Sequence, residues 1–310
     1  MTRTWVALGA VLLSGVAVLW STRQRTPAPE APITASATTS VDVSRPEPQA
    51  TAPTEVSVAA VDNDDLGCSV PDRGNGPYGA AIPLRDGKLW IGEPPPTSDF
   101  TLVLHFHGGE GARRTIAPAG MSVVLWTLDA GTGSSRYAQA FYGAGSVDGL
   151  ISDVAQQLAP ATMSRLVVSA WSAGYGAVRQ ILIHRPERPD AVILLDGLHA
   201  SYDNSGAIMT EEIEPFFKLA ARAQRGEAVM WFSHSEIVPP SYAGTREVAD
   251  LLIDELGGRR RYAGLRPIEG VELKTEYRDG NLRIRGFTGT GKKAHCAHLR
   301  MLDDALRSVL

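Results

Sequence analysis

The stretch LVVSAWSAGYGAVRQIL, at residues 166–182, decides the fold of this chain. An apolar run typical of a buried strand passes into Ala-Trp-Ser-Ala-Gly, and a helical pattern begins almost at once. A serine at such a tight strand-to-helix turn projects its hydroxyl, and the helix N-terminus faces any negative charge that develops there. Ser172 is therefore either a nucleophile or a small residue at an ordinary turn.

The residues two positions before and after Ser172 bear on this choice. They are Ala170 and Gly174, and a tight turn needs small side chains at both places. The usual pattern is G-x-S-x-G, so Ala170 departs from it, although by only one methyl group. The motif alone leaves the two interpretations about equal, and the rest of the chain has to decide between them.

A second motif precedes this turn. The sequence LVLHFHGG, at residues 102–109, is an apolar strand that ends in His-Gly-Gly. In α/β-hydrolases such a loop supplies an amide of the oxyanion hole, and its glycines let the backbone approach the substrate closely. From Tyr78 to the C-terminus, the chain resembles the α/β-hydrolase superfamily, particularly its bacterial serine esterase and depolymerase-like members. The resemblance implies an α/β fold with a mostly parallel central sheet and helices on both faces.

The remaining pattern agrees with this fold, because apolar runs alternate with helical spacings as in a parallel sheet covered on both sides. Strands are predicted at residues 78–84, 88–91, 101–107, 122–127, 165–170, 191–196, 228–233, 272–277 and 282–287. Helices are predicted at residues 147–158, 245–256 and 299–310. The first two strands and the last two are each expected to form a hairpin, since Asp-Gly lies between them.

The resemblance also implies the order serine, then acid, then histidine. The acid is either Asp196, which ends the strand after the Ser172 helix, or Glu236, which follows the next strand. Asp196 is preferred because an apolar strand delivers it into a glycine-containing turn, but the choice stays open. The base is expected to be His295, in the loop after the last strand, with His298 in the first helical turn as the alternative.

Together these residues imply a serine hydrolase that cleaves a carboxylic ester through an acyl-enzyme intermediate. Ser172 would attack the carbonyl carbon, His295 would accept the serine proton, and Asp196 would orient the imidazole. Backbone amides would hold the oxyanion, namely those of Ala173, Gly108 and Gly109. No cofactor is needed, and the expected partner is a small-molecule or polymeric ester.

Two other functions are compatible with the sequence. His105 and His107 share one strand face, and together with His295 and His298 they could bind zinc in a hydrolytic site. Against this, their strand runs straight into paired glycines that a metal site does not need. The same fold can also serve as a non-catalytic binding module. The sequence GFTGTGKK, at residues 286–293, nearly matches a phosphate-binding loop but lacks the hydroxyl that would hold magnesium.

The first 65 residues differ in composition from the rest of the chain. Residues 5–20 are almost entirely apolar, so residues 1–25 are predicted to be a signal peptide or an N-terminal membrane anchor. Residues 26–65 are rich in Pro, Ala and Thr and predict a disordered linker, with the α/β-hydrolase domain at residues 66–310. We therefore expect an exported protein, periplasmic or extracellular, either cleaved or tethered to the inner membrane by residues 5–20.

The charge of the chain bears on its binding partners, and its cysteine content bears on whether it contains a disulfide. The formal net charge is −4 and 21% of the residues are charged, which does not suggest a nucleic-acid surface. Membrane contact is expected only through the N-terminal segment. Cys68 and Cys296 are either a disulfide, as an exported protein allows, or two unrelated thiols. A disulfide would anchor the predicted base, His295, which is the neighbour of Cys296 in the chain.

Overall fold

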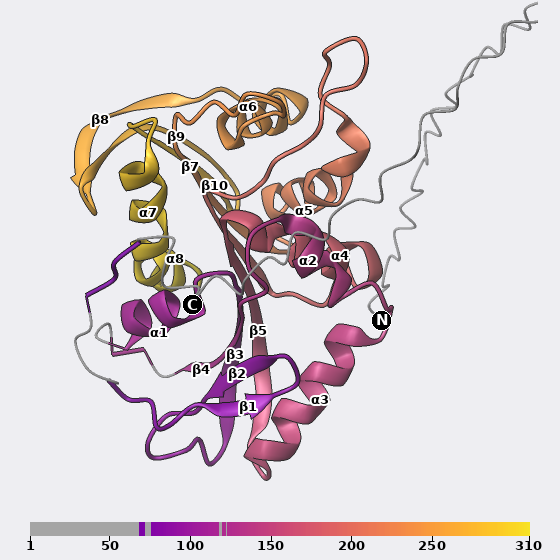
Figure 1. Ribbon diagram of the computed structural model, residues 1–310, viewed down its shortest axis with the longest axis vertical. Helices are drawn as coiled ribbons and strands as arrows, with labels where there is room; N and C mark the ends of the chain where they lie inside the picture. Colours follow the sequence, from indigo (N-terminus) through magenta and orange to yellow (C-terminus); the bar gives the residue numbers. More distant parts are fainter. Residues whose placement is uncertain (1–67, 72–75, 118–119, 122) are drawn as a thin grey trace, which may run out of the picture. The chain divides into compact units, whose positions relative to one another are not determined.

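The computed structural model describes residues 68–71, 76–117, 120–121 and 123–310 (Figure 1). The predicted signal or anchor segment and the predicted linker lie outside these residues. Among the described helices, none combines the length and the apolar character that crossing a membrane requires.

A single sheet runs through the described part of the chain, and its strand order is β1-β2-β4-β3-β5-β6-β7-β10-β9-β8. The central strands from β4 to β10 are parallel to one another, whereas the pairs at both edges are antiparallel. The strands are β1 (Ile82–Leu84), β2 (Gly87–Trp90), β3 (Asp99–Phe106), β4 (Val123–Leu128), β5 (Thr162–Trp171), β6 (Ala191–Leu195), β7 (Val229–His234), β8 (Arg261–Ile268), β9 (Val271–Asp279) and β10 (Leu282–Phe287).

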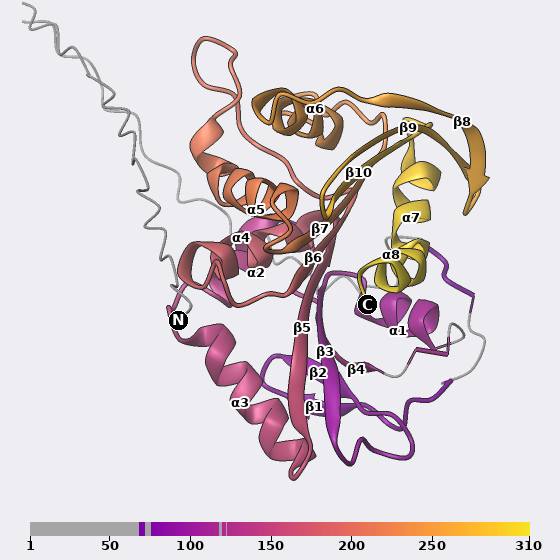
Figure 2. The same cartoon turned by 180° about the vertical axis from the view of Figure 1, so that it is seen from behind.

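Helices cover both faces of this sheet (Figures 1 and 2). One face carries α1 (Gly109–Ile116), α7 (Lys292–Arg300) and α8 (Leu302–Val309), whose apolar residues form one core cluster with that side of the strands. The opposite face carries α2 (Ser134–Gln139), α3 (Ser146–Leu158), α4 (Tyr175–His184), α5 (Glu214–Gln224) and α6 (Thr245–Glu255).

The strands β4 and β6 are almost entirely apolar because both of their faces are buried. Every residue of β4 (VVLWTL) and of β6 (AVILL) is buried, which explains why these strands show no alternation of polar and apolar residues. The predicted hairpins at both ends of the domain are confirmed as β1–β2 and β9–β10. This order and direction of strands is the α/β-hydrolase fold, as expected.

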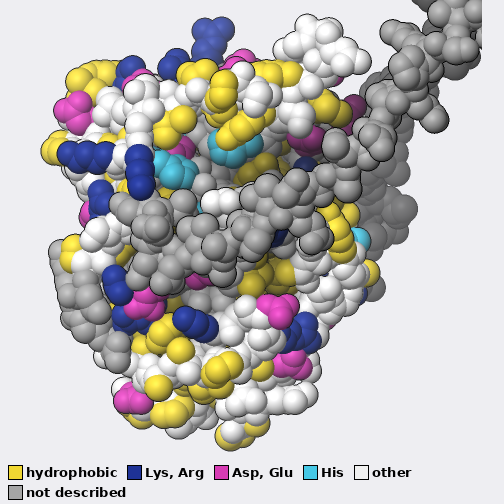
Figure 3. All heavy atoms as spheres, viewed as in Figure 1, with side chains coloured by type: hydrophobic (Ala, Val, Ile, Leu, Met, Phe, Trp, Pro, Cys, Tyr) yellow, Lys and Arg dark blue, Asp and Glu magenta, His cyan; other side chains and the backbone are white. Residues whose placement is uncertain are grey.

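The topology brings the predicted site residues together. The parallel strands β3, β5, β6 and β7 end at the same edge of the sheet, which is where ligands bind in open α/β sheets. A disulfide joins Cys68, the first described residue, to Cys296 in α7, with the two Cα atoms 5.0 Å apart. On the visible face of the molecule, acidic and basic side chains are interspersed with apolar ones (Figure 3).

Candidate active site

Ser172 lies directly after β5, in the short turn Ser172–Gly174 that leads into α4. Its φ is 49°, in the left-handed region that costs a non-glycine residue about 1–3 kcal/mol. The turn needs glycine at position 174, because a Cβ there would lie 2.1 Å from the carbonyl oxygen of Phe106. Ser172 thus has the strained conformation that exposes a nucleophile at the end of a strand.

The alanine at position 170 fits this turn. Ala170 is fully buried in the core between its partners in the adjacent strands, Phe106 in β3 and Leu194 in β6. Its methyl group therefore adds to the core and does not obstruct the turn. The departure from the usual glycine leaves the geometry at Ser172 intact.

His295 is bonded to Asp196 across the edge of the sheet. The two side chains meet at 2.7 Å, between Nδ1 of His295 and Oδ2 of Asp196. The other oxygen, Oδ1, accepts hydrogen bonds from the Ser235 amide and from the Thr245 hydroxyl, each at 2.8 Å. The carboxylate is thus held from three directions and presents one oxygen to the imidazole.

The environment of Asp196 keeps its carboxylate ionised. The side chain is buried, and burial by itself raises the pKa of a carboxyl group. The neighbouring histidines, His298 and His295, and the hydrogen bonds that the carboxylate accepts outweigh this effect and hold the pKa of Asp196 well below its usual range. Asp196 therefore accepts the proton on Nδ1 of His295, and this leaves Nε2 of His295 as the atom that can take a proton.

Glu236, the alternative acid, has other partners. Its carboxylate accepts a hydrogen bond from the ammonium group of Lys274 at 2.7 Å and one from the Gly289 amide at 3.3 Å. The hydrogen bond from Lys274 is the first cause of its lowered pKa. The structure thus brings Asp196 to His295 and places Glu236 in a separate ion pair.

The histidine segment differs from the expectation in one respect. His295 lies in the first turns of α7 and not in a loop, because the helix begins at Lys292, directly after Gly291. His298 lies one turn later and is fully buried, with its Nδ1 bonded to the Ser233 hydroxyl at 2.7 Å. Of these two histidines, only His295 lines the cavity in front of Ser172.

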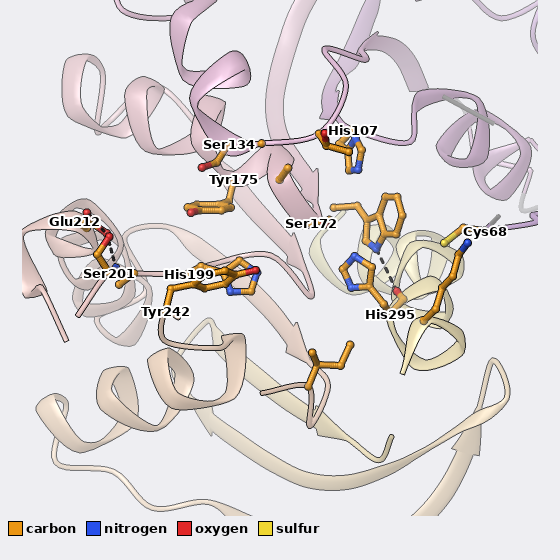
Figure 4. A pocket seen from close by; sticks show the side chains of 17 residues that line it. Cys68, His107, Ser134, Ser172, Tyr175, His199, Ser201, Glu212, Tyr242 and His295 are labelled. Carbon is orange, nitrogen blue, oxygen red and sulfur yellow. Dashed lines mark hydrogen bonds between the residues drawn. The ribbon is translucent and has the colours of Figure 1, made fainter. Parts of the chain in front are cut away.

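That cavity has a volume of about 720 Å³, and Ser172 and His295 both face it (Figure 4). Aromatic side chains make up much of its wall. The lining residues are Cys68, His107, Thr132, Gly133, Ser134, Trp171, Ser172, Ala173, Tyr175, His199, Ala200, Ser201, Glu212, Ile237, Tyr242, Lys292 and His295. Several of these, among them Ile237 and Tyr242, belong to no motif that could have identified them in the sequence.

The amides expected to hold the oxyanion separate into two groups. Ala173 lines the cavity in front of Ser172, in the short turn Ser172–Gly174. The amides of Gly108 and Gly109 instead donate to the carboxylate of Asp129, at 2.7 Å and 3.1 Å, and both glycines line a different cavity. The expected role of these two glycines therefore does not agree with the structure.

The reason lies in the neighbouring strand. Asp129 follows β4, which is the parallel neighbour of β3, so its carboxylate comes to lie beside the His-Gly-Gly loop. Asp129 is exposed, and its carboxylate is a charged acceptor that forms strong hydrogen bonds with the two glycine amides within its reach. An acidic residue at the end of the strand next to this loop is the signal that could have indicated this contact in the sequence.

The histidines of the zinc alternative do not form a common site. His105 makes hydrogen bonds with both ring nitrogens, to the Ser169 hydroxyl and to the carbonyl oxygen of His107. The ring of His107 is bonded to the hydroxyl of Tyr137 at 2.7 Å. Across the described residues, no three His, Cys, Asp or Glu side chains converge as metal ligands do, which contradicts the alternative.

The buried histidines predict a loss of stability in mild acid. Burial lowers the pKa of His105 and His234 to about 3 and that of His107 and His298 to about 4. All of them are mostly neutral in the folded protein above about pH 5, whereas histidines in the unfolded chain bind protons below about pH 6.5. Unfolding therefore takes up protons between pH 6.5 and 4, and the free energy of unfolding falls as the pH decreases.

Each histidine contributes about 1.4 kcal/mol per pH unit in this range, so the set together contributes up to about 5 kcal/mol per unit. Urea unfolding at pH 7, 6 and 5 measures the effect. Carboxylates with a lowered pKa, such as Asp196, lose their contribution only below about pH 4, outside this range. A free energy of unfolding that stays constant from pH 7 to 5 would contradict the prediction.

Comparisons with known proteins place the fold in context. No protein-family model matches the chain, and no curated protein matches it. Among solved structures, it is similar to an S-formylglutathione hydrolase from Agrobacterium tumefaciens, with 14% identity, a TM-score of 0.44, and 74% of this chain and 92% of that chain covered. A second S-formylglutathione hydrolase, from Staphylococcus aureus, is 12% identical with a TM-score of 0.43, covering 75% of this chain and 96% of that one.

An enterochelin esterase from Shigella flexneri is also similar, with 14% identity, a TM-score of 0.46 and coverage of 77% of this chain. The match spans 61% of the length of that esterase. Nothing about activity or substrate follows from likenesses as distant as these. The order and direction of its own strands give the chain the α/β-hydrolase fold.

Proposed function

We propose that this protein is an exported serine hydrolase that cleaves a carboxylic ester. One observation carries the proposal: the strained Ser172 opens on the same cavity as His295, whose other ring nitrogen is bonded to the buried Asp196. These three residue types in these roles are the means by which serine hydrolases activate a hydroxyl.

In the proposed mechanism, the Oγ atom of Ser172 attacks the ester carbonyl carbon while Nε2 of His295 takes the serine proton. Asp196 keeps the remaining N–H of the imidazole on Nδ1 and stabilises the imidazolium that forms. The tetrahedral intermediate collapses, the ester C–O bond breaks, and His295 returns its proton to the leaving alcohol. Water then attacks the acyl-enzyme with His295 again as base, which releases the acid and restores Ser172.

The amide of Ala173 is the proposed donor to the oxyanion. It lies in the short helical turn Ser172–Gly174, and the first amides of a helix have no partner within the helix. The dipole of the following helix α4 also favours negative charge at this point. One donor of this kind accounts for about a hundredfold to a thousandfold in kcat.

Export is the second part of the proposal. The apolar segment at residues 5–20 is its basis in the sequence. The disulfide between Cys68 and Cys296 supports it, because such bonds persist mainly in oxidising compartments such as the periplasm or the extracellular space.

Labelling with a fluorophosphonate tests the proposed chemistry. The purified protein should bind one equivalent of the probe, with the modified peptide containing Ser172, and should hydrolyse p-nitrophenyl esters from a panel of increasing acyl chain length. The labelling and the ester hydrolysis should both survive treatment with a chelator. Activity that is lost to the chelator but resists the phosphonate would point to a metal site, and neither hydrolysis nor labelling would point to a binding module.

A further inference from the structure

Trp171 is the last residue of β5 and stands directly before Ser172 in the chain. Successive side chains of a strand point to opposite faces, so Trp171 points away from the face on which Ala170 packs. It lies in the core cluster that includes α1, α7 and α8. Trp171 is only 2% exposed, yet it lines the cavity in front of Ser172. The sequence thus places a large aromatic ring between the nucleophile and the helix that carries His295.

The indole contacts His295 in two ways. Its Nε1–H donates a hydrogen bond to the backbone carbonyl oxygen of His295 at 3.1 Å. Its ring also lies against the imidazole of His295, with the ring centres 4.8 Å apart and an angle of 32° between the planes. Asp196 fixes one edge of this imidazole through Nδ1. The indole lies against its face and so limits rotation of the imidazole out of its own plane.

A second imidazole holds the indole in place. His107 stacks on Trp171 with the ring centres 4.8 Å apart and an angle of 9° between the planes. His107 is itself bonded to the hydroxyl of Tyr137, which also accepts a hydrogen bond from the Ala130 amide. Gly108 leaves the room that the indole needs, since a Cβ there would lie 3.0 Å from the Trp171 ring.

We propose that Trp171 is a positioning residue for His295, which it orients and, in the imidazolium form, stabilises. The inference rests on the proposed function, because the imidazolium arises only when His295 takes the proton of Ser172. Among aromatic side chains, the face of an indole attracts a cation most strongly. This attraction is absent while His295 is neutral, so it favours the transition state over the ground state.

The other groups around His295 are consistent with this role. Asp196 faces it from the end of β6, His298 from the same helix and His199 from the segment after β6. Burial lowers the pKa of His107 to about 4, so this ring is neutral at pH 7. The indole therefore carries no second cation when His295 becomes charged.

The test compares Trp171→Leu and Trp171→Phe in the full chain with Trp231→Leu as the matched control. Trp231 is equally buried in the same core cluster, but its ring faces the guanidinium of Arg285. Hydrolysis of p-nitrophenyl acetate gives kcat and KM for each variant, and thermal unfolding gives the change in stability. The control measures what the loss of a buried indole from this core does to turnover through packing alone.

Trp171→Leu should lower kcat about tenfold and leave KM nearly unchanged, as the loss of one desolvated cation–π contact predicts. Trp171→Phe retains an aromatic face and should lose less, about threefold. Trp231→Leu should lose a similar amount of stability and keep its kcat. If Trp171→Leu has the same kcat as Trp231→Leu, the inference is wrong.

Should Trp171→Leu not fold, Trp171→Phe decides the matter, because an unchanged kcat in that variant would overturn the role of Trp171. Failure of the proposed function itself has a different signature. In that case the wild-type protein shows no hydrolysis and no phosphonate label on Ser172. If the wild type is active and the Trp171 variants keep its kcat, only the inference about Trp171 is wrong.

Discussion

Replacing Ser172 with alanine is expected to lower kcat by about a millionfold, the size of effect seen when a serine protease loses its nucleophile. No acyl-enzyme can form, although His295 and Asp196 keep their hydrogen bond. The change removes one oxygen and keeps the Cβ atom, so the steric demand at the positive φ of this position stays the same. The fold and its stability should therefore be nearly unchanged, and the comparison of kcat with thermal unfolding measures both.

Ser201→Ala is the matched control for this variant. Ser201 lines the same cavity, but its amide and hydroxyl are both bonded to the carboxylate of Glu212. This control should retain most of its turnover and the full phosphonate label. If Ser172→Ala keeps wild-type turnover, or if the phosphonate attaches to another serine, then Ser172 is not the nucleophile.

Replacing Asp196 with asparagine is expected to lower kcat by about 10⁴-fold. The amide can turn its NH₂ group toward His295, which then keeps its proton on Nε2, the nitrogen that must accept the proton of Ser172. Asparagine is close to isosteric with aspartate, so Ser235 and Thr245 can still donate to the side-chain oxygen. The loss should therefore appear in kcat, with thermal unfolding reporting any structural effect separately.

Glu236→Gln tests the alternative that the sequence leaves open. It makes the same carboxylate-to-amide change at a residue that is paired with Lys274. Because a partly exposed ion pair contributes at most about 1 kcal/mol to stability, this variant should keep nearly full activity. A large loss of kcat in Glu236→Gln, with little loss in Asp196→Asn, would assign the acid to Glu236.

Much of the fold could be predicted from the sequence, because the central strands are buried on both faces and read as continuous apolar runs. The order of motifs along these strands then identified the edge at which Ser172, Asp196 and His295 lie. The strand β8 was missed because most of its residues are exposed, so no apolar pattern distinguishes it from a loop. Its position depends on pairing with β9, which is a property of the sheet and not of the segment.

The details of the site were harder to predict, because they depend on contacts between distant residues. Asp129 takes the amides of Gly108 and Gly109 only because β3 and β4 are neighbours in the sheet. The choice between Asp196 and Glu236 likewise depends on where α7 packs. Neither fact follows from the residues around the acidic side chain alone, because its partner depends on which elements are neighbours in the fold.

The disulfide has a topological consequence for the domain. The bond between Cys68 and Cys296 closes the intervening chain into a covalent ring, with a sequence separation of 228 residues. Ser172, Asp196 and His295 all belong to this ring. A protease that cuts one loop inside it therefore opens the ring without releasing a fragment, and two cuts are needed to separate Ser172 from His295. A nicked but oxidised protein therefore remains a single covalent molecule that contains Ser172, Asp196 and His295.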